Sequence, residues 1–180
     1  MKKLLLILIL FTSTIGCLSY GTVKDEFWGF TLRESKAQAI QKAKNYNMTL
    51  DYTAKGLIES YMYMDGDLLK SNPNLKKIIV ILYTYNNKLI DLYFNFSFNS
   101  EKASKNFFQD LKGKYSSRYG TAEKDYDNVL VIKNNGLVIS AIQKNENAKK
   151  SSVLFSASDD NLIKIAKKEV KKAEKEAKKQ

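Results

Sequence analysis

Histidine is absent from the 180-residue chain, and this excludes several kinds of chemistry at once. Without imidazole there is no histidine general base, no Ser-His-Asp triad and no histidine ligand for a metal ion. Cysteine occurs once, at Cys17, so the chain can form no internal disulfide and no thiolate cluster for zinc. The stability of the folded part must therefore come from a packed core.

Proline and glycine are also scarce, with one proline and eight glycines. This composition favours long regular elements over a loop-rich scaffold, and no glycine-rich phosphate loop is present. Hydrophobic residues make up 44% of the chain and aromatic residues 12%, which is enough to bury a core. The length predicts a single domain.

The N-terminus has the pattern of a secretory signal peptide over residues 1–16. Lys2 and Lys3 precede an unbroken apolar run, Leu4 to Phe11, and the small residue Gly16 follows. A run this short cannot span a bilayer, which needs roughly 20 apolar residues. We therefore expect export, followed by a tether over residues 17–26, a domain over 27–160 and a tail over 161–180.

Cys17 stands where that signal ends, and two interpretations apply. The residues Thr14-Ile15-Gly16-Cys17 resemble the lipobox of bacterial lipoproteins, although Thr14 stands where that motif prefers leucine. This resemblance implies cleavage before Cys17 and its lipidation, which would anchor the protein to a membrane of the cell envelope. Alternatively, cleavage after Ser19 would give a periplasmic or secreted protein that begins at Tyr20. The position of the lone cysteine favours lipidation.

Positive charge is concentrated at the C-terminus. The net charge is +11, and residues 161–180 contribute eight lysines and three glutamates. A strongly basic chain can indicate nucleic-acid binding, but an exported protein seldom meets nucleic acid. We expect no nucleic-acid partner, and instead an envelope protein or an anionic polymer or lipid.

Hydrophobic patterns predict two similar halves. A strand over Phe27 to Leu32 leads into a helix from about Lys36 to Lys44, with Ser35 and Gln38 as a capping box. Two strands flank Asn86-Asn87, a pair suited to a tight hairpin. In the second strand Ile90, Leu92, Phe94, Phe96 and Phe98 alternate with polar residues, which predicts one buried and one half-exposed face.

The second half repeats this order. A helix capped by Asn99 or Ser100 carries the stripe Ala103, Phe107, Leu111 and Tyr115 and ends at Gly120. A hairpin turns at Asn134-Asn135-Gly136, a strand covers Ser152 to Ala157, and a basic helix starts after Ser158 or Asp159. We predict an α+β fold: an antiparallel sheet with two helices packed on one face, plus a C-terminal basic helix.

Tyrosines are frequent on the predicted strands, and two interpretations stay open. A shared sheet face could bind peptide or sugar, because tyrosine is amphipathic and loses little entropy on ordering. Alternatively, the rings cover the outer side of the sheet or pack under the helices. The candidate ligand-face residues are Tyr61, Tyr63, Tyr83, Tyr85 and Tyr93.

Carboxylates come in pairs, at residues 65 and 67, 125 and 127, and 159 and 160. The Asp65-Gly66-Asp67 segment lacks the full spacing of a calcium-binding loop, so turns and helix caps are the expected roles. We predict no metal site, no cofactor and no catalytic residue. An acid pair of the glycosidase type could still be assembled from distant residues, which leaves a hydrolase or lyase of envelope polysaccharide as the alternative.

The basic tail has three interpretations: a solvated helix, a helix that contacts an anionic membrane or wall surface, and a partner-binding helix. Each lysine near an anionic leaflet contributes roughly 1 kcal/mol of binding free energy. The stripe along the tail is mostly alanine, which disfavours a strong helix-in-groove anchor.

Two segments resemble small exported bacterial domains: "FWGFTLRESKAQAI" from Phe27 and "FQDLKGKYSSRYGTAEK" from Phe108, with its Tyr119-Gly120 pair. Over residues 27–157 the chain looks similar to the helix-on-sheet repeats of β-lactamase-inhibitor-like proteins and of outer-membrane-assembly lipoproteins. The resemblance implies an α+β fold and a binding or scaffolding role, and it carries over no functional residue. We therefore expect a lipid-anchored, non-enzymatic envelope protein, or a secreted surface protein that binds a host factor.

Overall fold

The computed structural model describes residues 26–147 and 150–178. The expected signal peptide, Cys17 and the tether before Glu26 lie outside these residues. The elements, in chain order, are β1 (Glu26–Phe27), β2 (Phe30–Thr31), α1 (Lys36–Asn45), β3 (Thr49–Ala54), β4 (Ile58–Met64), α2 (Asp67–Lys70), β5 (Leu75–Tyr85), β6 (Lys88–Phe98), α3 (Glu101–Tyr119), β7 (Lys124–Tyr126), β8 (Val129–Asn134), β9 (Leu137–Asn147), β10 (Lys150–Asp159) and α4 (Asp160–Ala177).

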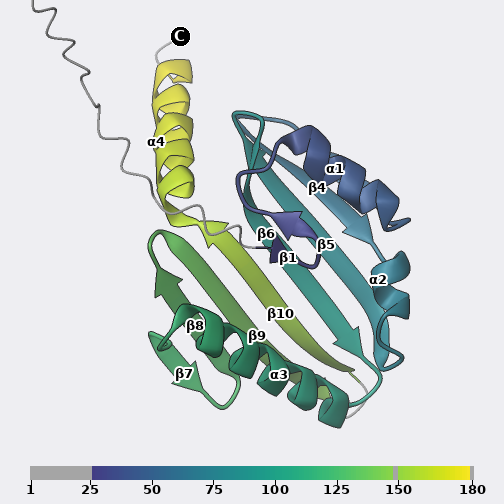
Figure 1. Ribbon diagram of the computed structural model, residues 1–180. Helices are drawn as coiled ribbons and strands as arrows, with labels where there is room; N and C mark the ends of the chain where they lie inside the picture. Colours follow the sequence, from purple (N-terminus) through teal and green to yellow (C-terminus); the bar gives the residue numbers. More distant parts are fainter. Residues whose placement is uncertain (1–25, 148–149, 179–180) are drawn as a thin grey trace, which may run out of the picture.

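An eight-stranded antiparallel sheet forms the body, in the order β3-β4-β5-β6-β10-β9-β8-β7 (Figure 1). Each half has a long helix followed by a meander of four strands; in the first half the β1–β2 hairpin precedes the helix and the short α2 lies between β4 and β5. The last strands of the two halves, β6 and β10, pair at the centre. Phe94 lies opposite Phe155 in that central pair. The predicted α+β class and the shared order of the halves are confirmed, and the pairing joins the halves edge to edge.

Helices α1 and α3 pack on one face of the sheet, as expected from their apolar residues (Figure 1). Ser35 caps α1 in a full capping box with Gln38, and Ser100 caps α3 through the Ala103 N–H. In α3 the buried stripe is rotated from the predicted one. Leu111 and Tyr115 are buried as expected, but Ser104 and Phe108 are buried while Ala103 and Phe107 are only partly so.

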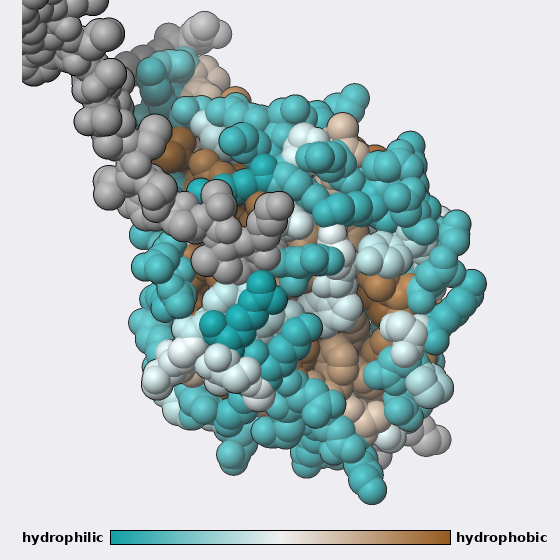
Figure 2. Space-filling view, viewed as in Figure 1, coloured by the Kyte–Doolittle hydropathy of each residue, from teal (hydrophilic) through white to brown (hydrophobic). Residues whose placement is uncertain are grey.

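Figure 2 shows this helix side of the molecule, which is mostly hydrophilic with apolar patches between the elements. The solvent-facing residues of α1 and α3 are lysine, glutamine and asparagine in large part, and they form that polar cover. The apolar core lies beneath them, between the helices and the sheet.

The predicted single strand over Phe27 to Leu32 is wrong, because this segment is a tight hairpin of β1 and β2. Its turn places Trp28 at φ +49° and Gly29 at φ +83°. A Cβ on Gly29 would lie 2.3 Å from the Tyr46 hydroxyl oxygen, so the turn needs glycine at this position. The turn directs Trp28 into the aromatic core, where its ring centroid lies 4.7 Å from Phe94 and 5.0 Å from Phe155.

The other predicted turns are confirmed by their left-handed residues. Asn86 and Asn87 join β5 to β6 at φ +47° and +61°, and Asn135 and Gly136 join β8 to β9 at φ +46° and +84°. The carboxylate pairs serve the backbone as expected at two places. Asp65 accepts a hydrogen bond from the Ile78 N–H at 3.1 Å, and Asp159 caps α4.

Helix α4 is anchored at its start. Asp159 accepts a hydrogen bond from the Leu162 N–H at 3.0 Å and pairs with Arg33, and the Asp160 N–H donates to the Gly136 carbonyl at 2.8 Å. The rest of the helix projects beyond the end of the sheet (Figure 1). Within the described residues, every helix is too short or too polar to cross a bilayer.

Candidate functional site

Among the described residues, the sheet face opposite α1 and α3 has no helical layer over most of its width. We call it the open face and define it by three cross-strand rows. They are Tyr83, Asp91, Ser158 and Val138; Ile81, Tyr93, Ser156 and Ser140; and Ile79, Asn95, Leu154 and Ile142. Each of these side chains is half-buried, as expected for residues that shield one another laterally but lie under no further layer.

Among the described elements, only the first turns of α4 reach the open face. Leu162, Ile163 and Ala166 pack with Tyr85 and Ile90 at the end of the β5–β6 hairpin, and Tyr83 borders this cluster. Ile90 was expected on the core face with Leu92. An irregularity in the pairing near Tyr83 and Thr84 turns Ile90 toward α4, because one extra residue in β6 shifts the alternation.

The chemistry of the open face is that of tyrosine, serine and aliphatic side chains. At its centre the Ser140 and Ser156 hydroxyls lie 2.8 Å apart across β9 and β10. Tyr93 stands beside Ser156 in the same row, and Tyr83 is close enough to Tyr93 to act on its pKa. Burial raises the pKa of the Tyr93 hydroxyl, and Tyr83 adds to the shift. Both rings remain neutral at physiological pH.

Asp91 places a carboxyl group within this half-apolar surface. Burial raises its pKa to about 6, against the lowering effect of hydrogen bonds from Ser158 and the Leu92 N–H and of the Lys167 charge. The Ser158 hydroxyl donates to Asp91 Oδ1 at 2.8 Å. The open face therefore holds a carboxyl group whose charge changes near neutral pH.

Asn95 supplies an unused hydrogen-bond acceptor near the centre of the open face. Its Oδ1 atom is buried, and it has no hydrogen-bond partner among residues 26–147 and 150–178. Its cross-strand neighbours on both sides are apolar, Ile79 and Leu154. An unpaired buried acceptor costs free energy, so this point of the open face carries a local penalty in the folded protein.

Two exposed tyrosines flank the open face at the outer strands. Tyr52 on β3 lies opposite Met62 and is 57% exposed, and Tyr126 on β7 lies opposite Val129 and is 61% exposed. Sequence reasoning missed both. Tyr126 belongs to a three-residue strand that was not predicted, and Tyr52 could be assigned to a face only after the bulge in β3 was known.

The predicted tyrosine set does not share one face. Tyr83 and Tyr93 lie on the open face, and Tyr85 is buried at its end beneath α4. Tyr61 and Tyr63 lie on the helix side, opposite Leu82 and Val80 of the core face. The strands β4, β5 and β6 are neighbours as the expectation required, but their register separates the two pairs.

Tyr61 belongs instead to a polar cluster that fastens α1 to the sheet. Its hydroxyl donates to Glu59, and the Lys36 ammonium lies 3.0 Å from the same carboxylate oxygen. These bonds, from Tyr61 and then Lys36, lower the pKa of Glu59. A second pair, Lys42 with Glu34, joins the same helix to the segment before it. The Tyr61–Glu59–Lys36 cluster and the Lys42–Glu34 pair therefore both serve to hold α1 in place.

The carboxylates in the described part of the chain are not grouped for metal binding. No three carboxylates lie close enough to hold a metal ion there. Asp91 has the raised pKa of a general acid, but the charge that acts on it is the ammonium of Lys167 rather than a second carboxylate.

Comparisons with protein-family models, with curated proteins and with solved structures gave no significant match to this chain.

Proposed function

We propose that the protein is a non-enzymatic binding module of the bacterial cell envelope, anchored by a lipid on Cys17, which engages a protein partner through the open face. The observation that carries the binding role is the open face itself. It is a half-apolar surface rich in tyrosine and serine, with exposed tyrosines at both edges. Tyrosine gives rigid contact area and serine gives adaptable hydrogen bonds, the combination found in antibody paratopes.

The size of the open face supports a protein partner. The three rows cover five residues along a strand, about 17 Å, and with Tyr52 and Tyr126 on the outer strands the surface extends roughly 34 Å across the sheet. Its footprint is somewhat smaller than the roughly 800 Å² that each partner contributes to a standard protein–protein interface. A short sugar chain would cover only part of it.

Site-specific crosslinking in intact cells tests the binding role. A photo-reactive amino acid is introduced at Tyr52, Tyr93 or Tyr126, and at Asn106 on the exposed side of α3 as the matched control. We expect one discrete crosslinked protein from the three open-face positions and none from Asn106. Crosslinks of equal yield at Asn106, or a product only on polysaccharide, would contradict the proposal.

Mass spectrometry of the mature N-terminus tests the anchor. A diacylglyceryl mass on Cys17 is the expected result. An unmodified mature chain that begins at Tyr20 would remove the anchor while leaving the binding role intact, because the open face does not involve Cys17.

A further inference from the structure

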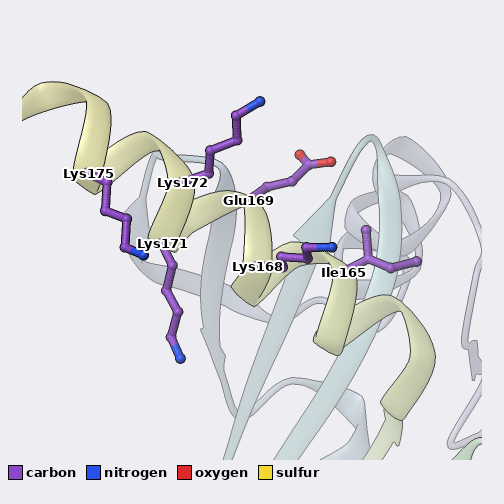
Figure 3. A pocket seen from close by; sticks show the side chains of 6 residues that line it. All are labelled: Ile165, Lys168, Glu169, Lys171, Lys172 and Lys175. Carbon is purple, nitrogen blue, oxygen red and sulfur yellow. The ribbon is translucent and has the colours of Figure 1, made fainter.

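Helix α4 carries a continuous row of lysines on the side that faces away from the molecule. We call Lys164, Lys168, Lys171, Lys175 and Lys178 the lysine stripe; they are spaced alternately four and three residues apart and all are exposed. This spacing puts them on one face of an α-helix, over a length of about 21 Å. Figure 3 shows Lys171 and Lys175 pointing to the same side of α4.

The stripe is largely without compensating negative charge. Lys164 pairs with Asp160 at 2.6 Å, whereas Lys168, Lys171, Lys175 and Lys178 make no ion pair within residues 26–147 and 150–178. None of the three glutamates of α4 lies in the row. Like charges three or four residues apart destabilise a helix, and the helix dipole favours lysine only in the last turn. Helix stability therefore does not account for Lys168 and Lys171.

Helix α4 lacks the large apolar residues that would anchor it in the groove of a protein partner. Its apolar side is occupied at the start, where Ala166 is fully buried against Tyr85 and Ile90. Beyond that point this side consists of Val170, Ala173 and Ala177. A helix that docks in a groove needs several large apolar anchors at this spacing. The one large exposed apolar residue, Ile165, stands beside the lysines instead (Figure 3).

We propose that the lysine stripe of α4 lies on the anionic phosphate headgroups of a lipid bilayer. A row of positive charges about 21 Å long matches a planar array of anionic phosphates. Ile165 is placed to enter the headgroup layer. This gives α4 a function separate from that of the open face.

The reach of the chain supports a bilayer as the partner, and this step rests on the proposed lipid at Cys17. The chain takes nine residue-to-residue steps from Cys17 to Glu26, which can span at most about 30 Å. Arg33, seven residues further on, pairs with Asp159 at the base of α4. Helix α4 is about 27 Å long, so an anchored domain holds the whole stripe within reach of the leaflet. A single lipid anchor binds reversibly, and a basic patch is a common second signal.

Vesicle sedimentation tests the proposal with the chain from Leu18 onward, which contains every described residue and no lipid. The probes are vesicles of phosphatidylglycerol mixed with phosphatidylcholine, and vesicles of phosphatidylcholine alone. Each lysine near an anionic leaflet changes partitioning about fivefold. The triple variant Lys168→Gln, Lys171→Gln, Lys175→Gln should bind the anionic vesicles roughly a hundredfold more weakly, and the neutral vesicles should not bind wild type.

The matched control removes the same charge elsewhere. Lys76, Lys77 and Lys102 are exposed at the end of the sheet opposite α4, and their triple glutamine variant should keep nearly all the binding. Equal losses in the two variants would refute the proposal, since net charge alone would then explain the binding. Absence of binding to anionic vesicles, or binding to soluble polyphosphate in its place, would also overturn it. Because the assay uses neither Cys17 nor the open face, failure here leaves the proposed function standing.

Discussion

At the scale of single residues, Asp91 links the open face to pH. Its pKa is about 6 in the folded protein against an ordinary value of 3.8. Between these values the folded state keeps a proton that the unfolded chain has lost. The free energy of unfolding should therefore fall as the pH rises through this window and level off above it.

Asp91→Asn tests this directly. Asparagine keeps the acceptor for the Ser158 hydroxyl and removes the buried charge. We expect the variant to be more stable than wild type by up to about 3 kcal/mol at about pH 7.5, and of similar stability near pH 3.5. Urea unfolding at the two pH values measures the difference, with the exposed Asp110→Asn as control. A gain of the same size at both pH values would show that the charge of Asp91 is not its origin.

The tyrosines show why residue roles were only partly predictable. Alternation along β6 correctly assigned Tyr93 to the half-exposed face. Successive side chains of one strand point to opposite faces, so the pattern within β6 is enough to tell them apart. The relation of Tyr61 to Tyr83 depends on how β4 and β5 are registered. A shift of one residue moves every side chain to the other face, and no local pattern specifies that shift.

At the scale of elements, local chemistry fixed most boundaries. The capping box at Ser35, the Ser100 cap and the asparagine turns each satisfy backbone groups within a few residues, so the sequence predicts them directly. The β1–β2 hairpin was missed because its turn depends on a tertiary contact. Trp28 adopts a left-handed conformation that the aromatic core stabilises through Phe94 and Phe155.

Asp159 controls the start of α4 in two ways that substitution can separate. It is buried, caps the helix through the Leu162 N–H and pairs with Arg33. Asp159→Asn keeps the cap and removes the charge, whereas Asp159→Ala removes both. We expect Ala to lower the free energy of unfolding by about 1–2 kcal/mol through the lost cap, and Asn to lower it less, because the Arg33 side chain is half-exposed.

Urea unfolding of the two variants measures this order. If Asn and Ala cost the same, the ion pair rather than the cap holds α4 in place. The anionic-vesicle assay on Asp159→Ala is an independent test. A frayed first turn would leave the lysine stripe less ordered, so binding to the anionic vesicles should weaken.

At the scale of the whole molecule, the two halves depend on each other. The helix-then-strands order of each half could be predicted from hydrophobic periodicity. Their edge-to-edge union could not, because the β6–β10 pair joins residues about sixty positions apart, such as Phe94 and Phe155. Separation of the halves would expose two strand edges and the aromatic cluster around Trp28, so neither half has a complete core alone.

This dependence predicts a single cooperative unfolding transition. Trp28 is the only tryptophan and lies at the junction between the halves, so its fluorescence reports that junction, while far-UV circular dichroism reports all elements. We expect the two signals to give coincident urea transitions. Ile132→Ala, a fully buried substitution in β8 of the second half, should cost about 2–5 kcal/mol. It should shift both transitions equally without changing their slope, because loss of the second half removes β10 from beneath Trp28. A Trp28 transition that stays in place while the dichroism midpoint moves would instead mean that the first half is a separate folding unit.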